Sequence, residues 1–98
     1  MNLIDFAEYV RKRWAKYPRD GIRNLAIMTL GLVGEAGEVS EPIKKEIRGD
    51  GPLDREKLKL ELGDVLHYWC CIANYYGLHP EDIMRANIAK LAERDTRG

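Results

Sequence analysis

The amino-acid sequence predicts an all-α fold, an antiparallel four-helix bundle made of a single domain over residues 1–98. Three observations lead to this prediction. Apolar residues recur at helical spacing in four segments, no segment alternates apolar and polar residues as a strand would, and the interruptions between segments are brief. A chain of 98 residues can also enclose one hydrophobic core, although only a modest one.

Each expected helix begins or ends at residues that break or cap helices. The helices are expected at about residues 2–16, 22–48, 54–76 and 80–94. Pro18 and Gly21 interrupt the pattern after the first helix. Asp54 can cap the third helix, Gly77 is a natural residue to follow its end, and Pro80 suits the first turn of the fourth.

The composition argues against a nucleic-acid binder or a membrane protein. Sixteen Lys and Arg residues balance sixteen Asp and Glu residues, whereas a protein that binds DNA or RNA usually carries a basic excess. No apolar run approaches the ~20 residues of a membrane-spanning helix, and no secretion signal is visible. Cys70 and Cys71 are adjacent and point about 100° apart on a helix, so we expect reduced thiols and a cytoplasmic protein.

Two acidic pairs with the same spacing lie on the second and third expected helices. They are Glu35 with Glu38, and Glu61 with Asp64. Residues three apart on a helix are neighbours, so each pair can present two carboxylates to one point. Glu35 and Glu61 each lie about 80° from the centre of the apolar stripe of their helix. The four carboxylates can therefore converge if the two helices pack along these stripes.

A converged acidic cluster requires a cation, because two carboxylates ~6 Å apart repel by roughly 3 kcal/mol at an effective dielectric constant of 20. Carboxylate oxygens without thiolates or paired imidazoles suit Mg²⁺ or Mn²⁺. Solvated acidic residues on two amphipathic helices are the competing interpretation. A di-iron site is a further alternative, since His67 follows Asp64 by three residues, but it needs a second Glu-x-x-His motif, and His67 is expected on the surface.

The last expected helix carries polar residues at a spacing normally used for core packing. Asn87, Lys90 and Arg94 share one face of this helix. They flank an apolar stripe that consists of Met84, Ile88 and Leu91. A basic ridge beside a packing face suits an anionic ligand such as phosphate. The alternative is a solvated face whose long side chains cover the bundle.

The second expected helix contains residues that are unusual inside a helix. Gly31, Gly34 and Gly37 recur every third residue, which leaves room for a ligand, for a second subunit, or for close packing within the chain. Pro42 predicts a kink or a break in the same helix.

Apolar residues also lie outside the main stripes of both long helices. They are Ile27, Leu30, Val33, Tyr68, Cys70 and Tyr75. This is more apolar surface than four short helices can cover, and it indicates a second packing surface that a symmetric partner would bury. We therefore expect a homodimer or a homotetramer.

Three segments, taken in order, carry a resemblance to a known family. They read GEAGEVSE at residues 34–41, ELGDVL at residues 61–66 and NIAKLAER at residues 87–94. Their Glu-x-x-Glu, Glu-x-x-Asp and Asn-x-x-Lys motifs resemble the signature of the MazG-like all-α nucleoside triphosphate pyrophosphohydrolases. The resemblance covers about residues 22–94, and relatives in that family form dimers or tetramers.

The resemblance implies an enzyme that hydrolyses a (deoxy)nucleoside triphosphate to the monophosphate and pyrophosphate with Mg²⁺, with Mn²⁺ as the alternative cation. The implied ligands of the metal are Glu35, Glu38, Glu61 and Asp64. The implied contacts to the substrate are Asn87, Lys90, Arg94 and Trp14. Glu38 is the candidate to orient or deprotonate the attacking water. Trp14 also lies on the apolar stripe of the first helix, where a purely structural role is the alternative.

Two other functions stay open at this stage. Phosphoribosyl-ATP pyrophosphohydrolases share the fold and the carboxylates, although they generally lack the Asn-x-x-Lys pattern. A non-catalytic helical module that mediates oligomerisation or binds a partner is the alternative from a different class. The motifs do not specify base or sugar, and a role in house-cleaning or in control of the nucleotide pool fits them.

Overall fold

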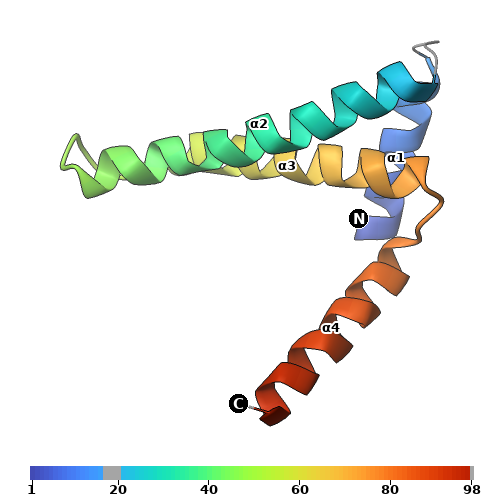
Figure 1. Cartoon of the computed structure of the whole chain (residues 1–98). Coiled ribbons are helices and arrows are strands. Elements are labelled where there is room, and N and C mark those ends of the chain that lie inside the picture. The colour runs from blue at the N-terminus through green and yellow to red at the C-terminus, as the bar shows by residue number, and fades with distance from the viewer. Residues whose placement is uncertain (17–20, 98) are drawn as a thin grey trace.

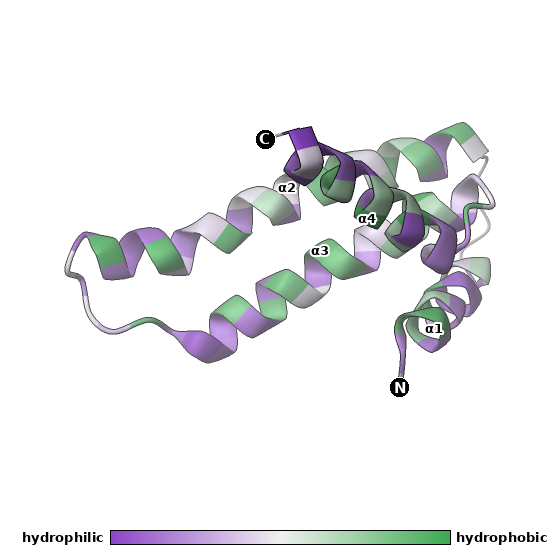
Figure 2. Ribbon diagram, turned by 90° about the horizontal axis from the view of Figure 1, so that it is seen from below, coloured by the Kyte–Doolittle hydropathy of each residue, from purple (hydrophilic) through white to green (hydrophobic). Residues whose placement is uncertain are grey.

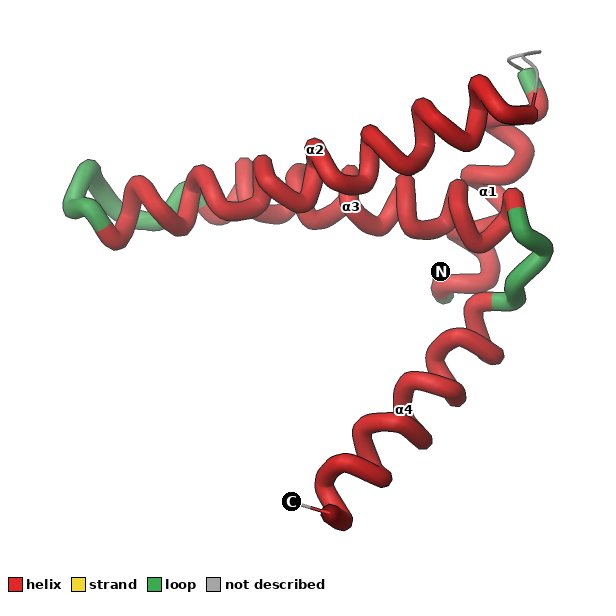
Figure 3. Tube along the Cα trace, viewed as in Figure 1, coloured by secondary structure: helices red, strands yellow, loops and turns green. Residues whose placement is uncertain are grey.

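The described residues form four helices, in agreement with the predicted all-α class. The computed structural model describes residues 1–16 and 21–97, and this part of the chain contains no strand. The helices are α1 (Leu3–Ala15), α2 (Gly21–Ile47), α3 (Arg55–Tyr75) and α4 (Pro80–Arg97), as Figures 1 and 3 show. The predicted bounds differ by one residue at both ends of α1, α2 and α3, whereas the predicted start of α4 is confirmed and α4 continues to Arg97.

The helix ends follow from local chemistry. The Asp54 side chain accepts a hydrogen bond from the backbone N–H of Lys57 at 3.0 Å and caps α3, as expected. Gly77 follows α3 with a φ of 65°, a left-handed conformation that suits glycine. Pro80 begins α4. The predicted break at Gly21 is wrong, because this residue is the first of α2; Pro18 lies outside the described residues.

Helices α2 and α3 form a long helical hairpin, and α1 crosses it at the end remote from the connecting loop (Figures 1 and 2). The buried core lies at this crossing and consists of Ala7, Val10, Met28, Cys70 and Cys71. The side-chain amide of Asn74 donates a hydrogen bond to the carbonyl oxygen of Ala7 at 3.0 Å and joins α3 to α1. The hydrophobic core therefore stabilises one end of the hairpin.

Helix α4 leaves this core and projects away from the hairpin (Figure 1). Its strongest packing is against α1. Pro80 is buried and Ile83 is half-buried, but every other described residue of α4 is exposed. The four predicted helices are thus present, and α4 diverges from the α2–α3 hairpin rather than lying along it. Helical periodicity identifies the apolar face of α4 but not the surface that covers it.

Further predictions concerned the proline inside α2, the two cysteines and membrane-spanning helices. Helix α2 runs without interruption through Pro42, so the predicted break is absent, and Pro42 is buried. Cys70 is fully buried beneath α1, so it does not belong to a surface left open for a partner. Both cysteines are free thiols, as predicted. None of the helices in the described ranges has the length and apolar character that crossing a lipid bilayer requires.

Candidate metal centre and the adjoining pocket

Three of the four predicted metal ligands meet between α2 and α3. Glu35 lies on α2, and Glu61 and Asp64 lie one turn apart on α3. One carboxylate oxygen from each residue lies within 4.8 Å of the others. Glu35 and Glu61 are half-buried at the edge of the helix contact, where their position beside the apolar stripes predicted them. We call Glu35, Glu61 and Asp64 the carboxylate cluster.

The carboxylate cluster has the donor chemistry of a magnesium site. Oxygen ligands ~2.1 Å from an octahedral Mg²⁺ lie roughly 3–4 Å from one another, which small side-chain rotations can reach from the present spacing. The cluster contains only carboxylates, whereas a di-iron site of the Glu-x-x-His type also needs imidazole ligands. The residues therefore fit Mg²⁺ or Mn²⁺ and do not fit the di-iron alternative.

The negative charges of the carboxylate cluster repel one another. Burial raises the pKa of Glu35, and the charge of Asp64 and a hydrogen bond with Glu61 raise it further. The charge of Glu38 acts weakly in the same direction. A divalent cation bound to the three carboxylates would offset this mutual repulsion, and it would lower the pKa of Glu35.

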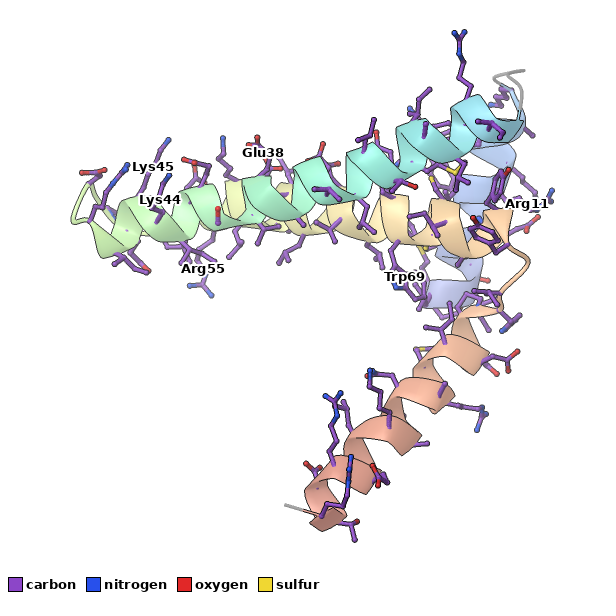
Figure 4. All side chains as sticks on the ribbon, in the orientation of Figure 1. Arg11, Glu38, Lys44, Lys45, Arg55 and Trp69 are labelled. Carbon is purple, nitrogen blue, oxygen red and sulfur yellow. The ribbon has the colours of Figure 1, made fainter. Side chains whose placement is uncertain are left out.

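Glu38 lies outside the carboxylate cluster. It is exposed on the outer surface of α2, on the side opposite to that from which α4 projects (Figure 4). It follows Glu35 by one turn, and its charge reaches that residue. The structure therefore brings together three of the predicted ligands and leaves Glu38 beside them.

A pocket of about 490 Å³ adjoins the carboxylate cluster, and Glu35 and Asp64 form part of its lining. Its other lining residues are Phe6, Tyr9, Arg13, Gly63, His67 and Tyr68. We call it the aromatic pocket, because rings from α1 and α3 face it together with one guanidinium group. Sequence reasoning missed the residues of α1. Phe6, Tyr9 and Arg13 follow one another at intervals of three and four, which marks a common helix face beside the core stripe.

Trp14 and His67 connect α1 to α3 behind this pocket. The indole Nε1 of Trp14 donates a hydrogen bond to Nε2 of His67 at 3.2 Å, and the two rings are stacked with centroids 6.2 Å apart. His67 is half-buried, so the expectation of a surface histidine is wrong; α1 crosses α3 here and covers it. Trp14 lines a separate pocket of about 170 Å³. A direct contact between Trp14 and a substrate stays a prediction.

The predicted phosphate contacts are remote from the carboxylate cluster within one chain. Asn87, Lys90 and Arg94 are all exposed on α4. Because α4 projects away from the hairpin, these side chains are not brought together with the acidic residues (Figures 1 and 4). Their role as substrate contacts stays a prediction.

Gly31, Gly34 and Gly37 of α2 have different surroundings. A Cβ atom on Gly31 would lie 2.5 Å from the ring of Tyr68, so this glycine permits close packing of α2 on α3. A Cβ atom on Gly34 or Gly37 would meet nothing within 4 Å. Packing within the chain therefore explains Gly31 but not the other two.

Comparison with known proteins identifies relatives. A family model described as the MazG nucleotide pyrophosphohydrolase domain matches residues 23–98. The gene 37 protein of Mycobacterium phage L5 is 36% identical over 97% of this chain and 90% of its own length. The uncharacterized protein YvdC of Bacillus subtilis (strain 168) is 33% identical over 64% of this chain and 68% of its own length. No solved structure was found to match.

Proposed function

The chain belongs to the MazG nucleotide pyrophosphohydrolase domain family, and on this premise we propose that it hydrolyses a (deoxy)nucleoside triphosphate to the monophosphate and pyrophosphate. A water oxygen forms a bond to the α-phosphorus, and the bond from that phosphorus to the oxygen bridging to the β-phosphate breaks. The observation that carries the proposal is the convergence of Glu35, Glu61 and Asp64 within 4.8 Å. A role in nucleotide-pool control within the cytoplasm fits this reaction.

The carboxylates would hold Mg²⁺ or Mn²⁺ through their oxygens, with Glu38 completing the set. The bound cation would neutralise charge that develops on the departing pyrophosphate. Glu38 is exposed one turn from Glu35, and it can accept a proton from the attacking water at that position. The whole chain, residues 1–98, would act as one catalytic domain.

We propose further that α4 of a second copy supplies the phosphate contacts. The apolar stripe of α4 is open to solvent, with Ile88 67% exposed. A second apolar surface lies on the hairpin, where a hollow of about 380 Å³ is lined by Leu3, Leu62, Val65, Leu66 and Trp69. Two apolar surfaces that one chain leaves uncovered favour packing of α4 from one copy on α3 of another.

The charges beside these surfaces are complementary. On α3, Leu62 follows Glu61, so the apolar hollow and the carboxylates lie about 100° apart round the helix. On α4, Ile88 follows Asn87 and Leu91 follows Lys90, so the apolar stripe and the basic ridge are offset by a similar angle in the same sense. Antiparallel packing of these two apolar faces would therefore bring the basic ridge to the side of the carboxylates.

The proposal is tested by incubating the full chain with a panel of nucleotides and Mg²⁺. The panel contains canonical and modified triphosphates and phosphoribosyl-ATP. We expect monophosphate and pyrophosphate as the primary products, loss of turnover in excess EDTA, and poor turnover with Ca²⁺, whose looser coordination positions phosphate less strictly. Orthophosphate as the primary product, or full activity in EDTA, would contradict the proposal. Absence of turnover with every substrate would favour the non-catalytic oligomerisation module.

The shared site is tested by mixing two inactive variants, Lys90→Ala and Glu38→Gln. If α4 acts in the site of the partner, half of the sites in a mixed dimer regain both residues, and random exchange gives about a quarter of the wild-type activity. If α4 acts within its own chain, no site regains both residues. Light scattering at micromolar concentration gives the oligomeric state, and a fully active monomer would contradict the composite site.

A further inference from the structure

The aromatic pocket contains a histidine, and a residue outside the pocket determines which ring nitrogen of that histidine carries the proton. The indole N–H of Trp14 can only donate a hydrogen bond, so the Nε2 atom of His67 that receives it at 3.2 Å must be unprotonated. A neutral imidazole that accepts at Nε2 carries its proton on Nδ1. Trp14 therefore selects the Nδ1–H tautomer of His67.

The surroundings of His67 agree with a neutral ring of this kind. Burial lowers the pKa of His67, and the charge of Arg13 lowers it further, against an opposing effect of Asp64. The Sγ atom of Cys71 lies 3.8 Å from the same Nε2. Burial raises the pKa of Cys71 to about 12, so this thiol is protonated and offers no negative charge that would draw a proton to Nε2.

The contacts of Trp14 and Cys71 with His67 are both made at Nε2, so neither residue engages Nδ1. His67 lines the aromatic pocket, whereas Trp14 and Cys71 line a different pocket. The residues that contact Nε2 thus do not line the aromatic pocket, which favours Nδ1 as the ring nitrogen that faces this pocket. Tyr68 packs edge-on against the imidazole with ring centroids 4.7 Å apart, which limits rotation of the ring.

We propose that the aromatic pocket receives the nucleobase of the substrate and that His67 donates its Nδ1–H to a carbonyl oxygen or an unprotonated ring nitrogen of that base. Trp14 is then a positioning residue, which acts through His67 in place of the direct substrate contact that the resemblance implied. This inference rests on the proposed function for the identity of the substrate. The rings of Phe6, Tyr9 and Tyr68 offer surfaces for stacking, and Asp64 at the edge of the same pocket places the phosphates toward the carboxylate cluster.

The tautomer can be measured on the full chain without metal or turnover. Long-range ¹H–¹⁵N spectra distinguish a protonated Nδ1 from a protonated Nε2. We expect His67 to be protonated at Nδ1 in the wild type and to shift toward the Nε2–H tautomer in Trp14→Phe, which keeps an aromatic ring but removes the N–H donor. A wild-type His67 protonated at Nε2 would overturn the proposal. Circular dichroism checks that Trp14→Phe is folded.

A matched pair of substitutions at His67 tests the donor itself. The side-chain amide nitrogen of Asn is as many bonds from Cα as Nδ1 of His, whereas the amide nitrogen of Gln corresponds to Nε2. We expect His67→Asn to retain a KM close to that of the wild type and His67→Gln to raise KM about tenfold, the value of one hydrogen bond, with a smaller change in kcat. Equal KM values for the two variants would contradict a donor at Nδ1.

Binding experiments separate a base ligand from a phosphate ligand. Adenosine, cytidine, guanosine and uridine, and separately inorganic pyrophosphate, are titrated into ¹⁵N-labelled protein. We expect at least one nucleoside to shift the Nδ1 resonance of His67. A shift with pyrophosphate alone, or with none of the five, would overturn the assignment. Because this readout needs no hydrolysis, a shift in a protein that lacks activity would reject the proposed function and leave the base pocket intact.

Discussion

Two regions of the molecule differ in what covers them: the crossing of α1 over the hairpin, and the apolar surfaces of α4 and α3. At the end crossed by α1, Val10, Cys70 and Cys71 are fully buried, and the pocket walls come from the same chain. On α4 and on the apolar hollow of α3, Ile88 and Leu62 are exposed. The first region is thus complete in a single chain, and the second has surfaces that a second copy can complete. The carboxylates that we propose to be catalytic adjoin both regions, since Asp64 lines the aromatic pocket and Glu61 precedes Leu62 of the hollow.

The largest expected effect tests whether the carboxylate cluster carries the chemistry. We expect Glu61→Gln to lower turnover by at least about a hundredfold, because an amide replaces a charged ligand. The apo protein should be as stable as the wild type or more stable, since one source of repulsion is removed without loss of volume. Mg²⁺ should raise the melting temperature of the wild type and have little effect on the variant.

Differential scanning fluorimetry with and without Mg²⁺ makes this measurement. Glu56→Gln is the matched control, because Glu56 lies on the same helix but pairs with Lys59 outside the cluster. A wild-type protein whose melting temperature does not respond to Mg²⁺ would mean that the carboxylates are only solvated.

A pair of apolar truncations compares the two regions directly. Val10→Ala removes buried methyl groups and should lower the free energy of unfolding by about 2–3 kcal/mol. Ile88→Ala, at an exposed position, should change the unfolding of dilute protein little but weaken the association of subunits. Urea titration at low concentration and sedimentation velocity at several concentrations distinguish the two effects. Equal destabilisation in dilute protein would show that α4 packs on its own chain.

Two glycines on one helix allow a smaller and sharper comparison. Gly31→Ala should destabilise the fold by about 1–3 kcal/mol, because the new Cβ meets the ring of Tyr68. Gly34→Ala has open space in the single chain and should stabilise α2 by up to about 1 kcal/mol. Thermal unfolding of dilute protein gives both values. A loss of association in Gly34→Ala alone would place the second copy against this face.

The smallest expected effect concerns the thiols under α1. Burial raises the pKa of Cys71 to about 12 and also raises that of Cys70, so both are protonated thiols at neutral pH. Alkylation by iodoacetamide at pH 8 should be slow in the folded protein and fast in urea. The rate in the folded protein should increase only as pH rises toward these pKa values. Rapid labelling at pH 8 would indicate that α1 opens readily.

Part of the structure could be predicted from the sequence, because the sequence signals for it are local. Asp54, Gly77 and Pro80 act within one turn of the helix ends that they define, and the predicted bounds are accordingly close. The meeting of Glu35 with Glu61 also followed from local spacing, since both residues flank the stripe along which α2 and α3 pack. These predictions needed only the period of the helix and the pairing of two neighbouring helices.

The remaining features depend on how α1 and α4 are placed, which periodicity does not determine. His67 and Cys70 were expected away from the packing face of α3, and both are covered because α1 crosses there. The aromatic pocket was missed for the same reason, since Phe6 and Tyr9 become pocket residues only in that crossing. The direction of α4 was not predictable either, because its apolar stripe fits a surface on its own chain or on another equally well.

The arrangement of the site along the chain has a consequence for the order of folding. Glu35, Glu61 and Asp64 all belong to the hairpin of α2 and α3, whose helices are joined by a short loop. The aromatic pocket needs α1, which is tied to α3 by the distant contact of Asn74 with Ala7. Because contacts that are close along the chain form at a lower entropic cost, we expect the hairpin to form first. Cation affinity would then arise in the nascent hairpin, and selectivity for a base would arise only when α1 docks.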